Sequence, residues 1–302
     1  MPNQVIALPF GRKMPTSRSQ GERDTFLAVP TAHKLDGPLS TAEYLREIGV
    51  RELPRATSPF DPGYDPITLE GHLEQSGHLM ATLKISMACW MIADERATRR
   101  KTAAAARVGV PTVGGGGPFE IAVAQGRLPH YLDLCADVGL NRIECAEGFT
   151  QLAESPERIV AMARERGLGV EFELGQKHAG AFGDRDVDRL LDQGRAWLDA
   201  GALRLVIEAR ESASSVGLFD EGGGFAAKLA ERFVDAFGLE QLVFETPTKQ
   251  SQFATLDHFG PEVRLANVRL EELLRVEIYR RGLHSDAFQH ELLRPSRPGA
   301  PA

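Results

Sequence analysis

The sequence predicts one α/β domain, a (β/α)₈ TIM barrel with an irregular N-terminal extension. From about residue 81 onward, short runs rich in β-branched residues alternate with amphipathic helical segments, which is typical of repeated βα units in a parallel sheet. The helical segments end in glycine, the residue that most readily adopts the left-handed conformation after a helix. The chain has 302 residues, and barrels of about 250 residues fold as one domain.

Seven apolar runs are predicted to be strands, and each is followed by enough residues for a loop and a crossover helix. They are residues 81–85, 110–113, 142–145, 169–173, 203–208, 242–245 and 263–266. The eighth strand that closes a barrel has room only between residues 51 and 67, where four prolines interrupt the pattern. An open, doubly wound sheet is the alternative, but no glycine-rich dinucleotide fingerprint follows the first strand.

The helix boundaries carry capping signals. Ser155, Pro156 and Glu157 are a serine cap, a proline suited to the first helical position and an acid suited to the positive helix end, so a helix is predicted over 155–166. A second helix is predicted over 186–200, with its apolar residues near one face. The glycines at predicted helix ends are Gly109, Gly139, Gly167, Gly201, Gly238, Gly260 and Gly282.

Composition and charge limit the class of protein. Residues 1–24 and 291–302 are predicted to be disordered tails flanking a barrel domain at 25–290. A formal net charge of −7 argues against a nucleic-acid partner, and no apolar stretch predicts a membrane span or a signal peptide. The three cysteines form no CxxC pair, so we expect reduced thiols in a cytoplasmic protein. Whether copies of the chain form a homo-oligomer is left open.

Four glutamates end apolar strands. Barrel enzymes place their working side chains at the C-terminal ends of the strands, so these acids are expected to meet at one mouth. They are Glu144, Glu173, Glu208 and Glu245. Paired structural charges are the plainer interpretation of any one of them. Several carboxylates buried together require a cation or raised pKa values, and oxygen-only ligation favours Mg²⁺.

Basic residues follow the same strand ends. Lys84, Lys177 and Arg210 are predicted catalytic or anion-binding residues alongside Glu208, and Lys249 lies just beyond Glu245. Salt bridges to the neighbouring acids are the plainer alternative for each. Cations at this density nevertheless predict a small anionic substrate.

A run of four glycines, 114–117, follows one strand and precedes a predicted helix start. Gly115 and Gly116 are therefore candidates for substrate binding through backbone N–H groups, although the run is not a P-loop and a flexible connection is equally consistent with it. Ser212, in a loop after Glu208, is a further candidate for substrate contact.

Several of these segments resemble phosphosulfolactate synthase. The most specific are Glu-Ala-Arg-Glu-Ser at 208–212 and Ile-Ala-Val-Ala-Gln-Gly at 121–126. The similarity extends over roughly residues 69–286 and includes segments 114–120, 143–144, 173–177, 244–247, 266–268 and 281–283.

The resemblance implies a barrel lyase that adds sulfite to phosphoenolpyruvate with Mg²⁺, an early step of coenzyme M biosynthesis in methanogens. The residues that occupy the matching strand ends are Lys84, Glu144, Glu173, Lys177, Glu208, Arg210 and Glu245. We expect Glu144, Glu173 and Glu245 as metal ligands and Lys84, Lys177, Glu208 and Arg210 as catalytic residues. The expected substrate-binding residues are Gly115, Gly116, Ser212, Lys249 and Asn267.

The first strand departs from that family. Phosphosulfolactate synthases have Asp-Lys-Gly where this chain has Asp61-Pro62-Gly63, and its Ser-Pro segment is closer to a heat-stress-associated branch. Two alternatives therefore stay open. One is a related lyase of specialised metabolism that uses another nucleophile or acceptor, and the other is a non-catalytic stress-associated barrel protein.

Overall fold

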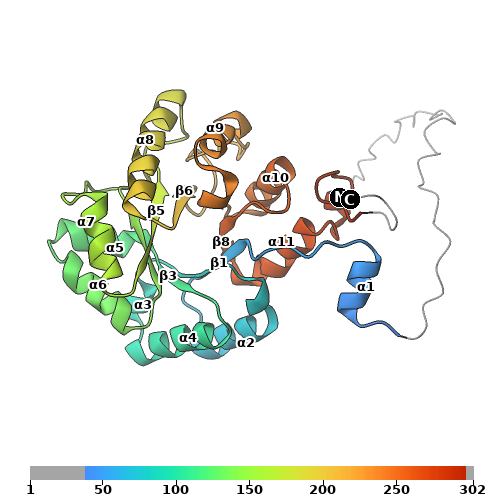
Figure 1. The fold of residues 1–302 in the computed structure, drawn as a ribbon, viewed down its shortest axis with the longest axis horizontal. Coiled ribbons are helices and arrows are strands. Elements are labelled where there is room, and N and C mark those ends of the chain that lie inside the picture. The colour runs from blue at the N-terminus through green and yellow to red at the C-terminus, as the bar shows by residue number, and fades with distance from the viewer. Residues whose placement is uncertain (1–37, 297–302) are drawn as a thin grey trace, which may run out of the picture. The chain divides into compact units, whose positions relative to one another are not determined.

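Eight parallel strands close into a barrel in chain order, with β8 pairing to β1, as the sequence predicts (Figure 1). The strands are β1 (Thr57–Asp61), β2 (Leu83–Ile85), β3 (Thr112–Gly114), β4 (Arg142–Ala146), β5 (Gly169–Leu174), β6 (Arg204–Ile207), β7 (Leu242–Glu245) and β8 (Leu265–Arg269). This computed structural model describes residues 38–296, so the tail predicted at 1–24 lies outside the described residues.

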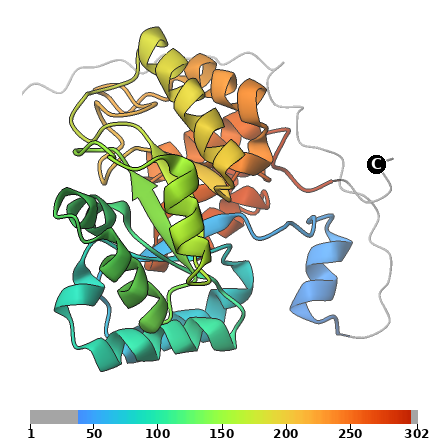
Figure 2. The ribbon, with the colours of Figure 1, turned by 60° about the vertical axis from the view of Figure 1, so that its left-hand side comes forward.

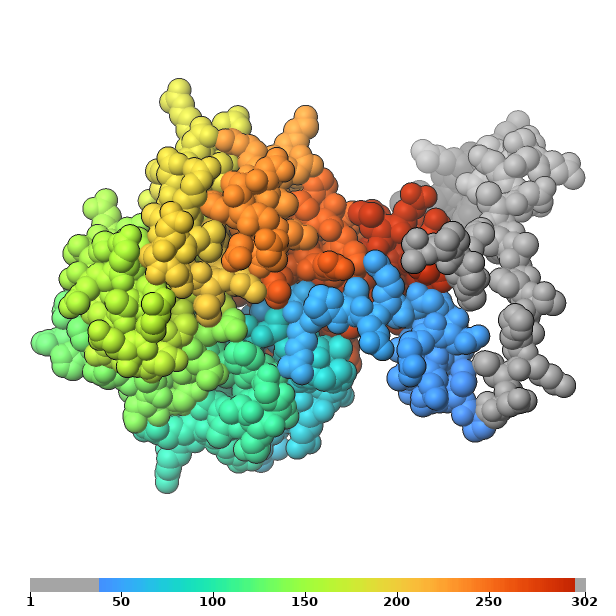
Figure 3. All heavy atoms as spheres, viewed as in Figure 1, coloured from blue at the N-terminus to red at the C-terminus, as the bar shows by residue number. Residues whose placement is uncertain are grey.

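Helices surround the barrel, and Figure 2 shows α7 in front of the strands, where it contacts β5. In the space-filling view, successive segments of the chain follow one another around the barrel, each packed against the next (Figure 3). The α-helices are α1 (Thr41–Glu47), α2 (Pro66–Ser76), α3 (Cys89–Ile92), α4 (Glu95–Arg107), α5 (Gly116–Ala124), α6 (Leu128–Asp137), α7 (Pro156–Arg164), α8 (Asp184–Ala200), α9 (Ala227–Phe237), α10 (Lys249–Phe259), α11 (Leu273–Arg280) and α12 (Ser285–Phe288). Short 3₁₀ turns are η2 (Gly77–Leu79), η3 (Leu239–Gln241) and η4 (Leu270–Glu272).

Side-chain alternation along the strands separates the barrel interior from the helix layer. In β5, Phe172 stacks on Trp197 of α8 with ring centroids 4.2 Å apart, whereas the next residue, Glu173, lines the mouth of the barrel. Successive side chains of a strand point to opposite faces, so one apolar run supplies both the outer core and an inward acid. A small inner cluster of Val206, Val243 and Ala266 fills the barrel between three adjacent strands.

The first strand forms despite its prolines. β1 pairs with β2 and β8, and its register to β8 shifts between Ser58 and Pro59. Proline has no N–H to donate to a ladder, so a bulge at that position lets the strand continue. Pro54, Pro62 and Pro66 lie outside the strand.

The helix ends agree with the predicted signals. Ser155 caps α7 by accepting a hydrogen bond from the N–H of Arg158, and all seven glycines at the predicted helix ends have positive φ. The observed strand bounds differ from the predicted ones by a few residues. The difference is clearest in β8, which begins and ends later than predicted. Among the described residues, no helix is long and apolar enough to cross a membrane.

The predicted C-terminal tail needs one correction. Within the described residues 291–296, Leu293 is buried in the main hydrophobic core, and the N–H of Ser296 donates to the carbonyl of Gly49. Burial of this one leucine holds a proline-rich segment whose composition predicted disorder. The rest of that tail, 297–302, lies outside the described residues.

Candidate active site

The four predicted glutamates meet at the C-terminal mouth of the barrel. They come from four consecutive strands: Glu144 from β4, Glu173 from β5, Glu208 directly after β6, and Glu245 from the end of β7. Each is no more than 2% exposed. Burial of four carboxylates in one ring demands compensating cations or protons.

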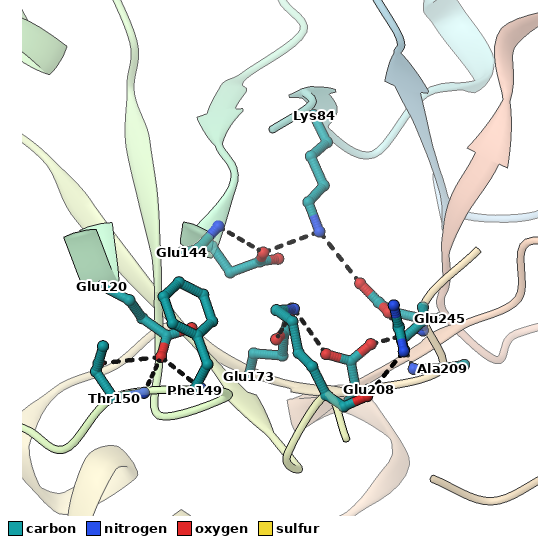
Figure 4. A network of polar contacts seen from close by, with 12 residues as sticks. Lys84, Glu120, Glu144, Phe149, Thr150, Glu173, Glu208, Ala209 and Glu245 are labelled. Atoms are coloured by element: carbon teal, nitrogen blue, oxygen red, sulfur yellow. Dashed lines mark hydrogen bonds and ion pairs between the residues drawn. The ribbon is translucent and has the colours of Figure 1, made fainter. Parts of the chain in front are cut away.

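Lys84 supplies one of those cations from β2, across the mouth. Its Nζ lies 2.9 Å from Oε1 of Glu144 and 3.1 Å from Oε1 of Glu245 (Figure 4). Burial lowers the pKa of Lys84, but Glu144, Glu245 and Glu173 outweigh this effect and raise the pKa well above its ordinary value. Lys84 is therefore a fixed ammonium ion.

Lys177 supplies the second cation from the loop after β5. Its Nζ lies 2.8 Å from Oε1 of Glu173 and 2.8 Å from Oε2 of Glu208. Burial lowers the pKa of Lys177, but the two carboxylates outweigh this effect and raise the pKa above its ordinary value. The side chain therefore stays charged. The salt bridges that the sequence allowed as a plainer interpretation are therefore present, yet they lie inside the mouth.

The carboxyl groups divide into two protonation types. Burial, together with Glu173 and Glu245, raises the pKa of Glu208 to about 9. Burial also raises the pKa of Glu173, but Lys177 and Lys84 outweigh it and hold this pKa at about 2. Burial raises the pKa of Glu144, and the ion pair with Lys84 opposes that rise. Near neutral pH the ring thus holds the protonated Glu208 beside the charged Glu173.

The backbone N–H of Arg210 and the ammonium of Lys177 both donate to Glu208, which favours its charged form. The raised pKa stands despite these donors because Glu208 is almost fully buried beside two other carboxylates.

The glycine run is closely packed at Gly114, Gly115 and Gly116, whereas a Cβ atom at Gly117 would meet open space. Gly115 caps α5, and the N–H of Gly116 donates to Oε1 of Glu144 at 3.0 Å. A Cβ atom at Gly116 would lie 3.2 Å from Cβ of Ala146. The run therefore lets a helix N-terminus approach the acid ring, where its positive end faces the mouth.

A cavity of about 710 Å³ opens above the ring and brings together nearly all of the predicted site residues. Those lining it are Lys84, Gly115, Gly116, Glu144, Glu173, Lys177, Glu208, Arg210, Ser212, Glu245 and Asn267. Lys249 is the exception, because it begins α10 and its Nζ lies 5.1 Å from the ring centroid of Phe253. The side chain of Lys249 is exposed, and its contact with substrate stays a prediction.

Arg210 is a cation at the mouth whose guanidinium is not paired with a carboxylate of the described residues. Its Nη1 donates to the carbonyl of Lys177 at 3.1 Å, and no carboxylate among the described residues forms a salt bridge with it. Its backbone is left-handed, with φ of 55°. Guanidinium groups bind carboxylate and phosphate groups bidentately, so Arg210 is suited to hold an anion.

Three carboxylates could hold a metal ion. One oxygen from each of Glu144, Glu173 and Glu245 lies within 4.8 Å of the others, and all three residues are buried. Such an all-oxygen set fits a hard divalent cation such as Mg²⁺. Two of these acids, Glu144 and Glu245, also contact Lys84. A bound metal ion and the ammonium group would therefore be neutralised by the same carboxylates.

Two groups of residues were missed by sequence reasoning. Ser86, Met87 and Glu211 line the cavity, and the first two could have been found because they directly follow a strand end. Glu120 is fully buried, and its Oε2 accepts hydrogen bonds from the N–H groups of Phe149 and Thr150, which fixes the loop after β4 (Figure 4). Glu120 lies in the family-like segment 114–120, but no sequence pattern assigned its side chain a role.

Comparison with known proteins agrees with this geometry. The family model of (2R)-phospho-3-sulfolactate synthase matches residues 53–286, which is most of the chain. The chain belongs to the phosphosulfolactate synthase family. The phosphosulfolactate synthase of Methanocaldococcus jannaschii is 28% identical over 233 residues, covering 77% of this chain and 93% of that protein. The enzyme of Methanothermobacter thermautotrophicus is 28% identical over 239 residues, covering 77% of this chain and 90% of that protein. The Bacillus subtilis enzyme is 26% identical over 175 residues, covering 58% and 69%.

Membership of the phosphosulfolactate synthase family confirms the resemblance found in the sequence and supports a lyase-type activity on a small substrate. The departure in the first strand also has a structural counterpart. Asp61 pairs with Lys101 of α4 at 2.7 Å, so its carboxylate is directed away from the mouth. Pro62, at the family's lysine position, lines a smaller pocket beside the main cavity.

Proposed function

We propose that the protein catalyses Mg²⁺-dependent addition of sulfite to phosphoenolpyruvate, forming the carbon–sulfur bond of phosphosulfolactate. The observation that carries this proposal is the ring of four buried glutamates with two fixed lysines, in a chain whose family model is a phosphosulfolactate synthase. A site that holds both cations and a protonated acid suits a reaction in which an anion gains negative charge and then a proton.

The chemistry places defined demands on these residues. The sulfur lone pair of sulfite bonds to carbon three of phosphoenolpyruvate, and the electrons of the carbon–carbon double bond move toward carbon two and the carboxylate. A divalent ion on Glu144, Glu173 and Glu245 would stabilise the negative charge that develops on that carboxylate.

The chain's own residues supply the remaining groups. Arg210 binds an anionic group of the substrate, and Lys84 and Lys177 keep the acid ring from repelling it. Glu208 has a pKa of about 9, so it holds a proton at neutral pH that it can donate to carbon two, and it then regains a proton from solvent.

The decisive assay incubates purified protein with phosphoenolpyruvate, sulfite and Mg²⁺ and follows phosphosulfolactate by ³¹P NMR. Product that forms with the wild type and is absent with Glu208→Gln supports the proposal. Absence of product with a folded, substrate-binding wild type would contradict it.

A related lyase with another nucleophile or acceptor is the second candidate. The observation that favours it is Pro62, which lines the pocket beside the main cavity where the resemblance leads us to expect a lysine. Turnover of a different acceptor, with none of phosphoenolpyruvate, would favour this candidate.

A further inference from the structure

A second cavity adjoins the acid ring on the side of β8, β1 and β2. This side pocket has a volume of about 190 Å³, and its walls include Phe60, Pro62, Met87, Pro247, Arg210 and Arg269. Arg210 and Met87 also line the main cavity, so the two spaces adjoin each other.

The backbone is strained where the two cavities meet. Among the described non-glycine residues, five have positive φ, and three of these, Met87, Arg210 and Asn267, line both cavities. Left-handed backbone at non-glycine residues is unfavourable and clusters at ligand-binding positions. The protein thus maintains this junction against a local conformational preference.

The walls of the side pocket combine apolar surface with limited positive charge. The guanidinium carbon of Arg269 lies 6.0 Å from the ring centroid of Phe60, and the Nε of Arg269 donates to Glu271 at 2.6 Å. Arginine has five N–H donors, so this contact fixes the group and leaves donors for a ligand. Glu211 lines the pocket beside Arg210. Two acids beside two arginines suit a single negative charge better than a phosphate dianion.

We propose that the side pocket is a second substrate subsite, which binds an apolar arm ending in one carboxylate or similar monoanionic group next to Arg269. The proposal rests on the second candidate function, a related lyase with another acceptor, since the arm belongs to the molecule that reacts at the acid ring and phosphoenolpyruvate has no such arm. The acceptor is then an acid whose reactive end lies at Glu208 and whose arm lies between Phe60, Pro62 and Pro247.

Binding of benzoate tests the subsite without any turnover. Isothermal titration or ligand-observed NMR would measure benzoate and the neutral, nearly isosteric benzamide with the full-length protein. We expect benzoate to bind and benzamide to bind more weakly. Arg269→Gln should lower the affinity for benzoate by about tenfold or more, because it removes a charge-assisted hydrogen bond. Arg195→Gln, which removes an exposed arginine paired with Asp192 on α8, should leave benzoate affinity unchanged.

A second variant tests the site by gain. Pro62→Lys adds a cation to the same pocket and should raise the affinity for benzoate several-fold. The test therefore stays valid even if Arg269→Gln folds poorly. No benzoate binding, equal binding of benzamide, or unchanged benzoate affinity in both variants would overturn the proposal. Because no sulfite or phosphoenolpyruvate is present, a failure of the sulfite reaction and a failure of this subsite are separate results.

Discussion

The ammonium nitrogen of Lys84 lies 2.9 Å from Oε1 of Glu144, and both side chains are almost completely buried. The two residues come from strands on different sides of the mouth, so this contact ties β2 to β4 across the site. A buried carboxylate that loses its only nearby cation is left uncompensated, and that loss is much larger than the net strength of the pair.

Lys84→Met should therefore lower the free energy of unfolding by about 3–5 kcal/mol, because it leaves Glu144 and Glu245 without their cation. Urea unfolding at neutral pH would measure the loss. Lys249→Met is the matched control, since Lys249 is exposed and, among residues 38–296, its ammonium makes only a cation–π contact with Phe253, worth about 1 kcal/mol or less. Equal losses in the two variants would refute the assignment of Lys84 as the counter-ion of the ring.

Glu208→Gln should change how stability depends on pH. The pKa of Glu208 is raised to about 9 in the folded protein, so between its ordinary value and about 9 the folded state holds one more proton than the unfolded state. Its contribution to stability is therefore full at low pH and is lost as the pH rises through about 9. The glutamine does not titrate, so wild-type stability should fall more steeply than that of the variant between about pH 5 and about pH 9.

Urea unfolding of both proteins across that range provides the measurement. Parallel curves would mean that Glu208 is ionised throughout and would remove it as the proton donor. The same variant should lack product in the ³¹P NMR assay at every pH.

Magnesium should bind more weakly when one ligand is removed. Glu245→Gln takes away one of the three clustered carboxylates and should reduce the affinity for Mg²⁺ by about tenfold or more. This is the typical size of the loss when a residue that supports a metal site is mutated. Glu171→Gln is the matched control, because Glu171 is buried on β5 but pairs with Arg142 instead of joining the cluster. Mn²⁺ binding followed by electron paramagnetic resonance would report affinity directly. Similar weakening in both variants would argue against a metal on this ring.

Gly217 should be intolerant of any side chain. It has φ of 56°, and a Cβ atom there would lie 2.0 Å from the carbonyl oxygen of Glu208. Gly217→Ala should lower the free energy of unfolding by about 2–5 kcal/mol and displace Glu208. Gly180→Ala is the comparison, because Gly180 also has positive φ but open space around its Cβ position, so strain alone should cost about 1–2 kcal/mol. Thermal unfolding would separate the two, and equal effects would show that the contact with Glu208 is relieved easily.

The acid ring could be predicted from the sequence because parallel strands bring their C-terminal ends to one edge. Glu144, Glu173 and Glu245 each end an apolar run, so counting strands was enough to place them together. The same rule does not extend to Lys249, which begins α10 and does not line the main cavity, because the rule states where a strand ends and not where the side chains of the following helix lie.

Other features depend on contacts that no local pattern encodes. Glu120 holds the loop after β4 from within a helix, and Asp61 is directed away from the mouth by Lys101 on α4, forty residues further along the chain. Arg269 ends β8, which the sequence places too early, so its position beside Phe60 followed only from the closed barrel.

The acids of the mouth all come from the consecutive strands β4 to β7, whereas the side pocket is built chiefly from the ends of β8, β1 and β2. One arc of the barrel therefore carries the carboxylates, whereas the other arc supplies Lys84 and most of the side-pocket walls. Mutations in the second arc can change which molecule is accepted while leaving the carboxylate arc intact. Such a barrel can acquire a new substrate specificity through substitutions in the side pocket, without first losing its acid ring.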